Sequence, residues 1–265
     1  QLLPIATEQL QWMPFVNPKL HTSMIKFIYW TIRQLDSGIQ QHATMTSTMR
    51  RLGEDIFKGI VSKGNPHSSP DQPTESKSKS AAFFRSSCMP LRFLSTLIVL
   101  KTVTQVDYLA QAFDSLRKDL QTDEGKALFV EYQCLPVISS HLKVSSRVLL
   151  SSALDGLLQM TTESDSLQPF LEACSNESFF HSCSVLLRSS KLDIQILEKL
   201  CSILQKLSRI KSNKKMFELF ALHQTIQELH RTTDPDHAFL CINLNSILLN
   251  LGLSRTNSLT SSLSG

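Results

Sequence analysis

The chain has 265 residues, of which 42% are hydrophobic and 19% are charged, so it can bury a core and does not have the composition of a disordered protein. Its net charge of +4 is too small to indicate nucleic-acid binding. With only 8 glycines and 10 prolines the chain has few turn formers, which argues against a sandwich or barrel of many short strands.

Residues 1–61 are expected to form an N-terminal segment of three helices. Asn17 followed by Pro18 is typical of a helix start, and apolar residues then recur at helical spacing. A further run between Met45 and Ile60 has spacings of three and four residues. The four large residues of the segment 27–30 surround a full turn, so neighbouring helices, a partner or a second copy of the chain must cover them.

Two segments have the composition of flexible chain. Residues 62–80 are rich in serine and proline and contain no apolar residue, and we expect a flexible loop over 62–89. Residues 254–265 are rich in serine and threonine and are expected to form a disordered tail. Between them, residues 90–253 are expected to form armadillo-like helical repeats.

A leucine pattern recurs through residues 90–253. A leucine followed three and four positions later by aliphatic residues occurs four times, at separations of 60, 46 and 44 residues. The last two separations match the period of about 40–47 residues in armadillo and HEAT repeats. The pattern can arise by chance in a leucine-rich helical protein, but the spacing and helix order favour repeats. The sequence therefore predicts an all-α, armadillo- or HEAT-like solenoid with an N-terminal helical extension and a long flexible loop. The four occurrences begin at Leu94, Leu154, Leu200 and Leu244.

The apolar stretches and the cysteines predict a cytoplasmic protein. The longest uncharged apolar stretch, 93–100, is far shorter than a membrane span. None of the six cysteines belongs to a C-x-x-C pair, and scattered cysteines in a large helical chain are typical of a reduced compartment. Because the chain begins with Gln1 and has no basic-then-apolar leader, we expect it to be a piece of a longer protein.

No motif in the sequence indicates an enzyme. Glycine-rich phosphate loops, H-E-x-x-H and EF-hand patterns are absent, so no cofactor, metal ion or small-molecule substrate is expected. Three histidines are seven residues apart in a segment that Asp234 and Pro235 interrupt, and surface roles are favoured over a metal site. These are His223, His230 and His237. A cysteine beside His181 could form a nucleophile and base, but buried helical cysteines are usually inert. The cysteines concerned are Cys174 and Cys183.

A basic run extends from Lys199 to Lys215, because no acidic residue lies between Glu198 and Glu218. The run can be a solvated turn with cations near a helix C-terminus. Alternatively, it can bind an acidic peptide or an acidic helix. Nucleic acid is disfavoured because no aromatic residues lie among the cations. The candidate partner-binding cations are Lys206, Lys214 and Lys215.

An asparagine at a fixed place in each repeat holds the backbone of an extended peptide in peptide-binding armadillo proteins. Among the four matching positions here, Asn250 alone is an asparagine, so a long extended peptide is disfavoured and a helical or folded partner is favoured. Asn243 lies seven residues before it on the same polar stripe, and both are candidate groove residues. The four matching positions are Leu100, Met160, Lys206 and Asn250.

The last predicted helix, 240–253, is apolar around most of its circumference. Burial against neighbouring helices can explain this composition. The alternative is cover by a partner or by a second copy, because the end of a solenoid needs a polar outer face or a cap. Self-association into a homo-oligomer is therefore the alternative to docking of another protein.

Six stretches of the sequence are specific to one protein rather than general motifs: residues 9–16 (Q-L-Q-W-M-P-F-V), 49–59 (M-R-R-L-G-E-D-I-F-K-G), 91–97, 167–174, 211–215 and 239–245. Together they resemble the C-terminal region of the coiled-coil domain-containing protein 138 family. The resemblance implies a scaffold of the centrosome, the centriolar satellites or the ciliary base, with a coiled coil upstream. It implies no enzymatic activity and transfers no binding residue. We therefore expect a protein–protein interaction module that docks a centriolar or ciliary partner through a helical segment, without contact to membrane or nucleic acid.

Overall fold

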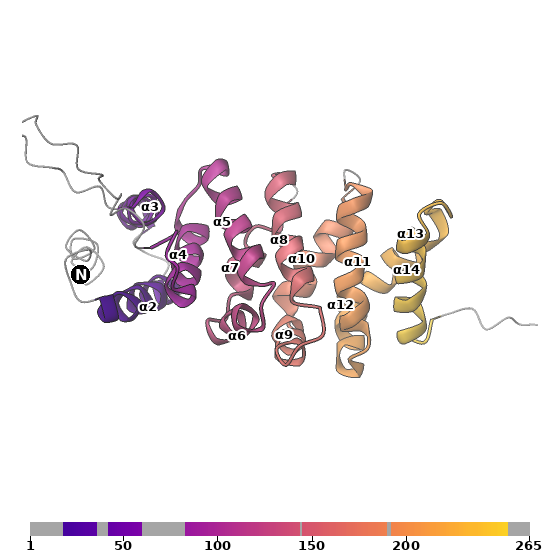
Figure 1. The fold of residues 1–265 in the computed structure, drawn as a ribbon. Helices are drawn as coiled ribbons and strands as arrows, with labels where there is room; N and C mark the ends of the chain where they lie inside the picture. Colours follow the sequence, from indigo (N-terminus) through magenta and orange to yellow (C-terminus); the bar gives the residue numbers. More distant parts are fainter. Residues whose placement is uncertain (1–17, 36–41, 60–82, 144, 190–191, 254–265) are drawn as a thin grey trace, which may run out of the picture. The chain divides into compact units, whose positions relative to one another are not determined.

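The computed structural model describes residues 18–35, 42–59, 83–143, 145–189 and 192–253, and every regular element within these ranges is a helix (Figure 1). The helices belong to two compact units, residues 1–137 and residues 138–265. Among the described residues, no helix is both long enough and apolar enough to cross a membrane. Because every described regular element is a helix, the prediction of an all-α fold is confirmed.

The first unit is built around α4 (Met89–Thr102). Three helices pack against it, namely α2 (Pro18–Leu35), α3 (His42–Lys58) and α5 (Val106–Asp119). A further helix, α6 (Asp123–Glu131), contacts both α4 and α5. α4 is buried around nearly its whole circumference, as its apolar composition requires.

The predicted N-terminal segments fall partly outside the described residues. α2 and α3 are two of the three helices predicted over 1–61, and the first of the three lies outside them. The predicted loop over 62–89 lies outside them as far as residue 82, and at its C-terminal end Phe83 and Phe84 are buried. The predicted tail, 254–265, also lies outside them. The domain boundaries drawn from the sequence remain predictions.

The four large residues of α2 are divided between core and surface. Ile28 and Tyr29 are buried, whereas Phe27 is exposed. The hydroxyl of Tyr29 donates a hydrogen bond to the carbonyl oxygen of Tyr132 at 2.7 Å, and burial raises the pKa of Tyr29 above its ordinary value. Neighbouring helices therefore account for Ile28 and Tyr29 but not for Phe27.

Arg92 of α4 and Asp119 of α5 form an ion pair in the first unit. The Nη2 and Nε atoms of Arg92 donate to Oδ1 of Asp119 at 2.6 and 3.1 Å, and the Asp119 carboxylate is buried. The Nη1 atom of Arg92 donates to the carbonyl oxygen of Ser86 at 2.6 Å. One guanidinium therefore fixes both the end of α5 and the segment that leads into α4.

α6 begins directly beside the end of α5. The hydroxyl oxygen of Thr122 caps α6 by accepting a hydrogen bond from the backbone nitrogen of Gly125 at 3.1 Å, and it donates to the carbonyl oxygen of Asp119 at 2.8 Å. A Cβ atom at Gly125 would lie 2.0 Å from that carbonyl oxygen and 2.5 Å from its carbon. A larger residue therefore fits between α5 and α6 only if the backbone moves.

The second unit contains three long helices, α8 (Arg147–Gln159), α11 (Ile194–Ser208) and α14 (Ala238–Asn250). α11 packs against both α8 and α14. The last three occurrences of the leucine pattern lie on these helices, so the separations of 46 and 44 residues correspond to successive helices that lie side by side. Their first leucines are all buried: Leu154, Leu200 and Leu244.

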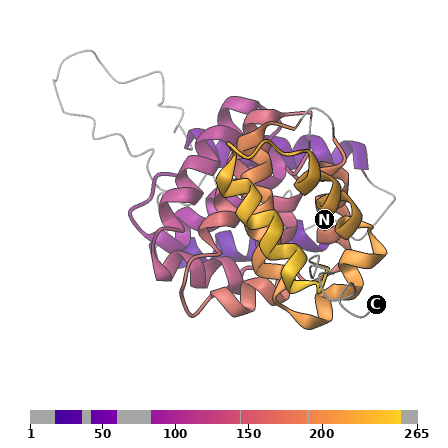
Figure 2. The same ribbon diagram turned by 90° about the vertical axis from the view of Figure 1, so that its right-hand side faces the viewer.

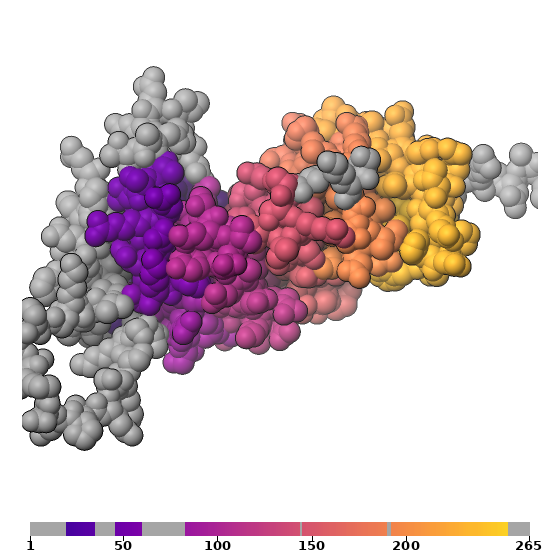
Figure 3. Space-filling model, turned by 90° about the horizontal axis from the view of Figure 1, so that it is seen from above, coloured from indigo at the N-terminus to yellow at the C-terminus, as the bar shows by residue number. Residues whose placement is uncertain are grey.

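Shorter elements connect the long helices. α13 packs against α14, and Figure 3 shows these two helices, in yellow, beside the orange side chains of the preceding helices. The short helix α7 (Leu135–Ser139) contains the boundary between the two units. The other connecting elements are α9 (Leu167–Cys174), α10 (Glu177–Leu187), the 3₁₀ turn η2 (Lys211–Asn213), α12 (Lys214–Leu219) and α13 (Leu222–Thr232).

Three thiols are buried in the core of the second unit, those of Cys174, Cys183 and Cys201. Burial raises the pKa of each thiol, and that of Cys201 rises to about 12. Such thiols stay protonated at neutral pH and are poor nucleophiles. The ring of His181 lies against that of Phe220, with 5.8 Å between centroids. These contacts favour a packing role for the cysteines.

The buried thiols predict a pH dependence of stability. Their pKa values in the folded state lie above the unfolded value of about 8.5. The contribution of the protonated thiols to the free energy of unfolding is therefore fully present below that pH, and it is lost as the pH rises toward the folded pKa values. We expect the free energy of unfolding to fall above pH ~8.5 by up to about 1.4 kcal/mol per pH unit for each thiol. Urea unfolding followed by circular dichroism at increasing pH measures this slope. Cys183→Ala should flatten the curve, and an unchanged slope would contradict the prediction.

Candidate partner-binding site

A row of polar side chains joins α11 to α14. The Nδ2 atom of Asn250 donates to the hydroxyl of Ser208 at 2.9 Å, and the Nδ2 atom of Asn243 donates to the hydroxyl of Ser202 at 3.4 Å. Between these two bonds, the side-chain amide of Gln205 donates to the hydroxyl of Ser246 at 3.1 Å. Residue numbers increase in the same direction on both helices, so α11 and α14 run parallel and in register.

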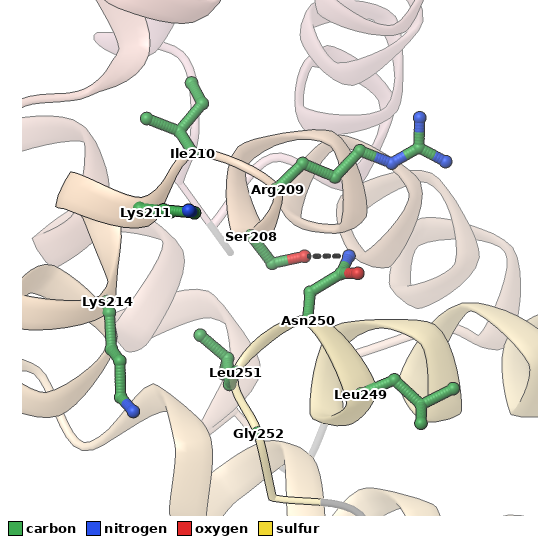
Figure 4. Close-up of a pocket in the computed structure, with 9 residues that line it drawn as sticks. All are labelled: Ser208, Arg209, Ile210, Lys211, Lys214, Leu249, Asn250, Leu251 and Gly252. Carbon is green, nitrogen blue, oxygen red and sulfur yellow. Dashed lines mark hydrogen bonds between the residues drawn. The ribbon is translucent and has the colours of Figure 1, made fainter.

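A pocket of about 540 Å³ opens where both helices end. Lys211 and Lys214 extend from η2 and the start of α12 on one side, and Asn250 and Leu251 face them from the end of α14 (Figure 4). The dashed line in Figure 4 is the hydrogen bond between Asn250 and Ser208. The remaining lining residues are Arg209, Ile210, Leu249 and Gly252.

The charged residues that line the pocket are all cations: Arg209, Lys211 and Lys214. No ion pair joins any of the three to another described residue. The absence of acidic residues between Glu198 and Glu218 explains this local excess of positive charge. The pocket therefore presents cations beside the apolar side chains of Ile210, Leu249 and Leu251.

Helix dipoles explain only part of this arrangement. Arg209 caps the C-terminus of α11, where the partial negative charge of the helix end stabilises a cation. Lys214 instead is the first residue of α12, and Lys211 is the first of η2. The positive ends of these elements do not favour lysines. The interpretation of the basic run as a turn stabilised by a helix C-terminus therefore does not account for Lys211 and Lys214.

The structure brings two of the five predicted site residues together. Lys214 and Asn250 line the same pocket. Lys206 lies outside it and pairs with Glu163 at 3.6 Å. Lys215 is exposed on α12 but does not line the pocket. Asn243 also lies outside the pocket, and its Nδ2 atom donates to the carbonyl oxygen of Phe239 at 3.1 Å as well as to Ser202.

Sequence reasoning did not single out several residues of the site. Arg209 and Lys211 belonged to the basic run, but nothing local indicated that η2 would bring them to the end of α14. Ser202, Gln205 and Ser208 recur every three residues on α11, and this spacing was the available signal for the polar row.

A second pocket, of about 420 Å³, lies in the first unit between α4 and α5. Its charged residues are of both signs, and two of them, Arg92 and Asp119, bind each other. Its three cations and two carboxylates leave a smaller excess charge than that of the first pocket, which has three cations and no carboxylate. Within the described ranges, no group of three or more His, Cys, Asp or Glu side chains is placed to hold a metal ion.

Two solved structures share the fold. An engineered protein is 13% identical with a TM-score of 0.51, and the likeness covers 94% of this chain and 91% of that one. A designed armadillo repeat protein in complex with the peptide (KR)4 is 9% identical with a TM-score of 0.50, over 92% of this chain and 91% of that one. At these identities the likeness shows the fold alone, which confirms the predicted armadillo-like repeats. An armadillo-like fold fits a protein-interaction module.

Sequence comparison gives the family. The family model of the "Coiled-coil domain-containing protein 138, C-terminal domain" matches residues 1–251. Over 264 residues, the chain is 70% identical to coiled-coil domain-containing protein 138 of Homo sapiens and 65% identical to that of Mus musculus. These matches cover 100% of this chain but only 40% and 39% of the relatives' length. The chain therefore belongs to the family of the C-terminal domain of coiled-coil domain-containing protein 138.

Proposed function

We propose that the chain is a non-enzymatic protein–protein interaction module of a scaffold at the centrosome, the centriolar satellites or the ciliary base. Its basic pocket docks an acidic helical segment of a centriolar or ciliary protein. The observation that carries the docking proposal is the pocket between α11, α12 and α14, whose charged lining residues are all cations. The cellular location is what the resemblance to coiled-coil domain-containing protein 138 implies, and it is part of the proposal.

Charge supports an acidic ligand. Arg209, Lys211 and Lys214 have no ion pair with another described residue, so a carboxylate that enters the pocket gains attraction without displacing an existing partner. The designed armadillo protein that shares the fold was solved with a cationic peptide. The pocket described here would instead attract an anionic ligand, because its own charged residues are cations.

The asparagines support a helical ligand rather than an extended one. Asn250 alone occupies an armadillo asparagine position, and its amide nitrogen already donates to Ser208. An extended peptide would therefore lack the row of amides that holds its backbone. An amphipathic helix brings its own backbone hydrogen bonds, and it can place apolar residues against Leu249 and Leu251 with acidic residues toward Lys211 and Lys214.

Charge reversal in the pocket is expected to abolish docking. The variant Lys211→Glu/Lys214→Glu should lose a discrete partner that the unaltered chain captures from a centrosome-enriched lysate, as read by mass spectrometry. We expect at least a tenfold loss, which corresponds to about 1.4 kcal/mol, because two attractions become repulsions. Capture by the unaltered chain should weaken as salt increases, since exposed charges are screened.

A matched control separates the pocket from the net charge of the chain. Lys143→Glu/Lys215→Glu changes the charge by the same amount at two exposed lysines of the second unit that lie outside the pocket. This variant should retain capture within about twofold, as expected for surface charges away from the contact. Equal loss in both variants, or loss in neither, would refute the pocket as the docking site.

A further inference from the structure

The last helix of the second unit carries apolar side chains on two opposite faces. Leu240, Leu244 and Ile247 are buried against the unit, where α14 packs on α11 and α13. Figure 2 shows α14, in yellow, in front of the other helices of the second unit, so no other described helix of that unit covers its outward face. We call the apolar side chains of this face the outer stripe, which consists of Phe239, Ile242 and Leu249 with exposed fractions of 58%, 67% and 54%.

The spacing of the outer stripe matches a helix–helix seam. Together with Ser246, its residues follow steps of three, four and three positions, which is the repeat of the contact face in a two-helix coiled coil. The stripe extends about 15 Å along the helix at 1.5 Å per residue. A second helix can therefore pack along the whole length of α14.

Charge identifies the kind of helix that fits. Residues 238–253 contain no Asp, Glu, Lys, Arg or His, so the seam suits an equally neutral surface. The two ends of α14 differ, because Asp234 and Asp236 precede its N-terminus while Lys211 and Lys214 lie in the pocket at its C-terminus. In an antiparallel pair of two α14 helices, the acidic residues before the helix in one copy lie near the basic pocket of the other copy. The two helix dipoles then point in opposite directions, which is the electrostatically favourable arrangement.

We propose that the outer stripe of α14 pairs, antiparallel and around a two-fold axis, with the same stripe of a second copy of this chain. A second copy supplies the neutral apolar seam and both complementary ends at once. The stripe offers on the order of a few hundred Å² per copy, below the roughly 800 Å² per partner of a stable interface. The dimer is therefore weak and dissociates in the micromolar range or above.

Sedimentation equilibrium of the 265-residue chain tests the pairing. The mean mass should rise from 29.8 kDa toward twice that value as the concentration increases through the micromolar range. Ile242→Glu should hold the chain at the monomer mass, because it places a charge in the seam. Val185→Glu is the matched control, since Val185 is equally an exposed aliphatic residue but lies on α10, and it should leave the dimer intact.

Mixtures of variants test the orientation. An antiparallel pair whose two-fold axis passes between Asn245 and Ser246 places Ile242 of one copy opposite Leu249 of the other. A mixture of the Ile242→Lys and Leu249→Glu chains should therefore recover dimers that neither variant forms alone. Recovery by a mixture of Ile242→Lys and Ile242→Glu instead would show parallel pairing and overturn the proposal. Failure of the variants to fold cannot produce either pattern, because an unfolded chain is not rescued by mixing.

Three further results would overturn the pairing. They are a monomer mass at every concentration, a dimer that Ile242→Glu leaves intact, and association that appears only after residues 254–265 are removed, which would assign the stripe to those residues. Leu249 belongs to both the outer stripe and the basic pocket, whereas Ile242 lies outside the pocket. The Ile242→Glu variant therefore tests the pairing alone, and the docking proposal is decided by the Lys211 and Lys214 variant.

Discussion

Gly125→Ala is expected to destabilise the first unit by about 3 kcal/mol, because the added methyl group would overlap the backbone of α5. The new Cβ would lie 2.0 Å from the carbonyl oxygen of Asp119, which also accepts hydrogen bonds from the hydroxyl and the backbone nitrogen of Thr122. Relief requires α5 and α6 to separate, which disturbs the cap of α6. Trp30 lies on α2 of the first unit, and residues 138–265 contain no tryptophan, so urea unfolding followed by tryptophan fluorescence measures this loss.

Gly53→Ala provides the comparison for this contact. A Cβ at Gly53 would meet the Oγ1 atom of Thr102 at 2.1 Å and the Cγ2 atom of Val103 at 2.8 Å. These atoms belong to side chains, so relief requires a rotamer change that breaks the hydrogen bond from Thr102 to the carbonyl oxygen of Ile98 but no shift of the backbone. Alanine also favours a helix interior over glycine by about 1 kcal/mol. We therefore expect a clearly smaller loss than at Gly125. Equal losses at both positions would show that the distinction between backbone and side-chain neighbours is wrong.

Asp119→Ala is expected to cost about 3–5 kcal/mol, since it leaves the Arg92 guanidinium without its carboxylate in a partly buried site. The same fluorescence-detected unfolding of the first unit measures the effect. The double variant Arg92→Leu/Asp119→Leu removes both charges and should recover part of the loss, because it leaves no unpaired charge. The difference between the single and double variants gives the coupling of the two side chains.

An exposed ion pair supplies the control for the buried one. Arg147 and Asp193 form an ion pair in the second unit in which the Arg147 side chain is largely exposed. Asp193→Ala should therefore cost less than about 1 kcal/mol. If both aspartate variants lost the same stability, burial of the carboxylate would not be the cause of the large effect at Asp119.

The sequence predicted features that depend on local pattern. Helical spacing of apolar residues can be recognised within a single segment of sequence. It therefore predicted the three helices that contain Leu154, Leu200 and Leu244. Their repeat at 46 and 44 residues then predicted that the helices would lie side by side, and they do. The stretches specific to one family predicted the relatives that comparison found.

Features that depend on the register between helices were not predictable. Lys206 belonged to the basic run, but its partner Glu163 lies on an earlier part of the chain, and only the packed structure brings them within 3.6 Å. Asn250 was predicted as a groove residue and lines a pocket, while its bond to Ser208 depends on how α11 aligns with α14. The steric role of Gly125 likewise depends on where α5 ends, and a sequence pattern does not specify that position.

The buried cysteines also allow the local opening of the helices to be measured in the unaltered chain. Cys134 is buried in the first unit, and Cys174, Cys183 and Cys201 are buried in the second. An alkylating reagent can reach these thiols only when the surrounding helices separate, whereas the exposed Cys88 reacts in the folded state. Labelling rates read peptide by peptide in a mass spectrometer would therefore compare the two units in a single sample, without the introduction of any new cysteine. Equal rates would mean that both halves of the chain open in one cooperative event, and different rates would mean that each half opens by itself.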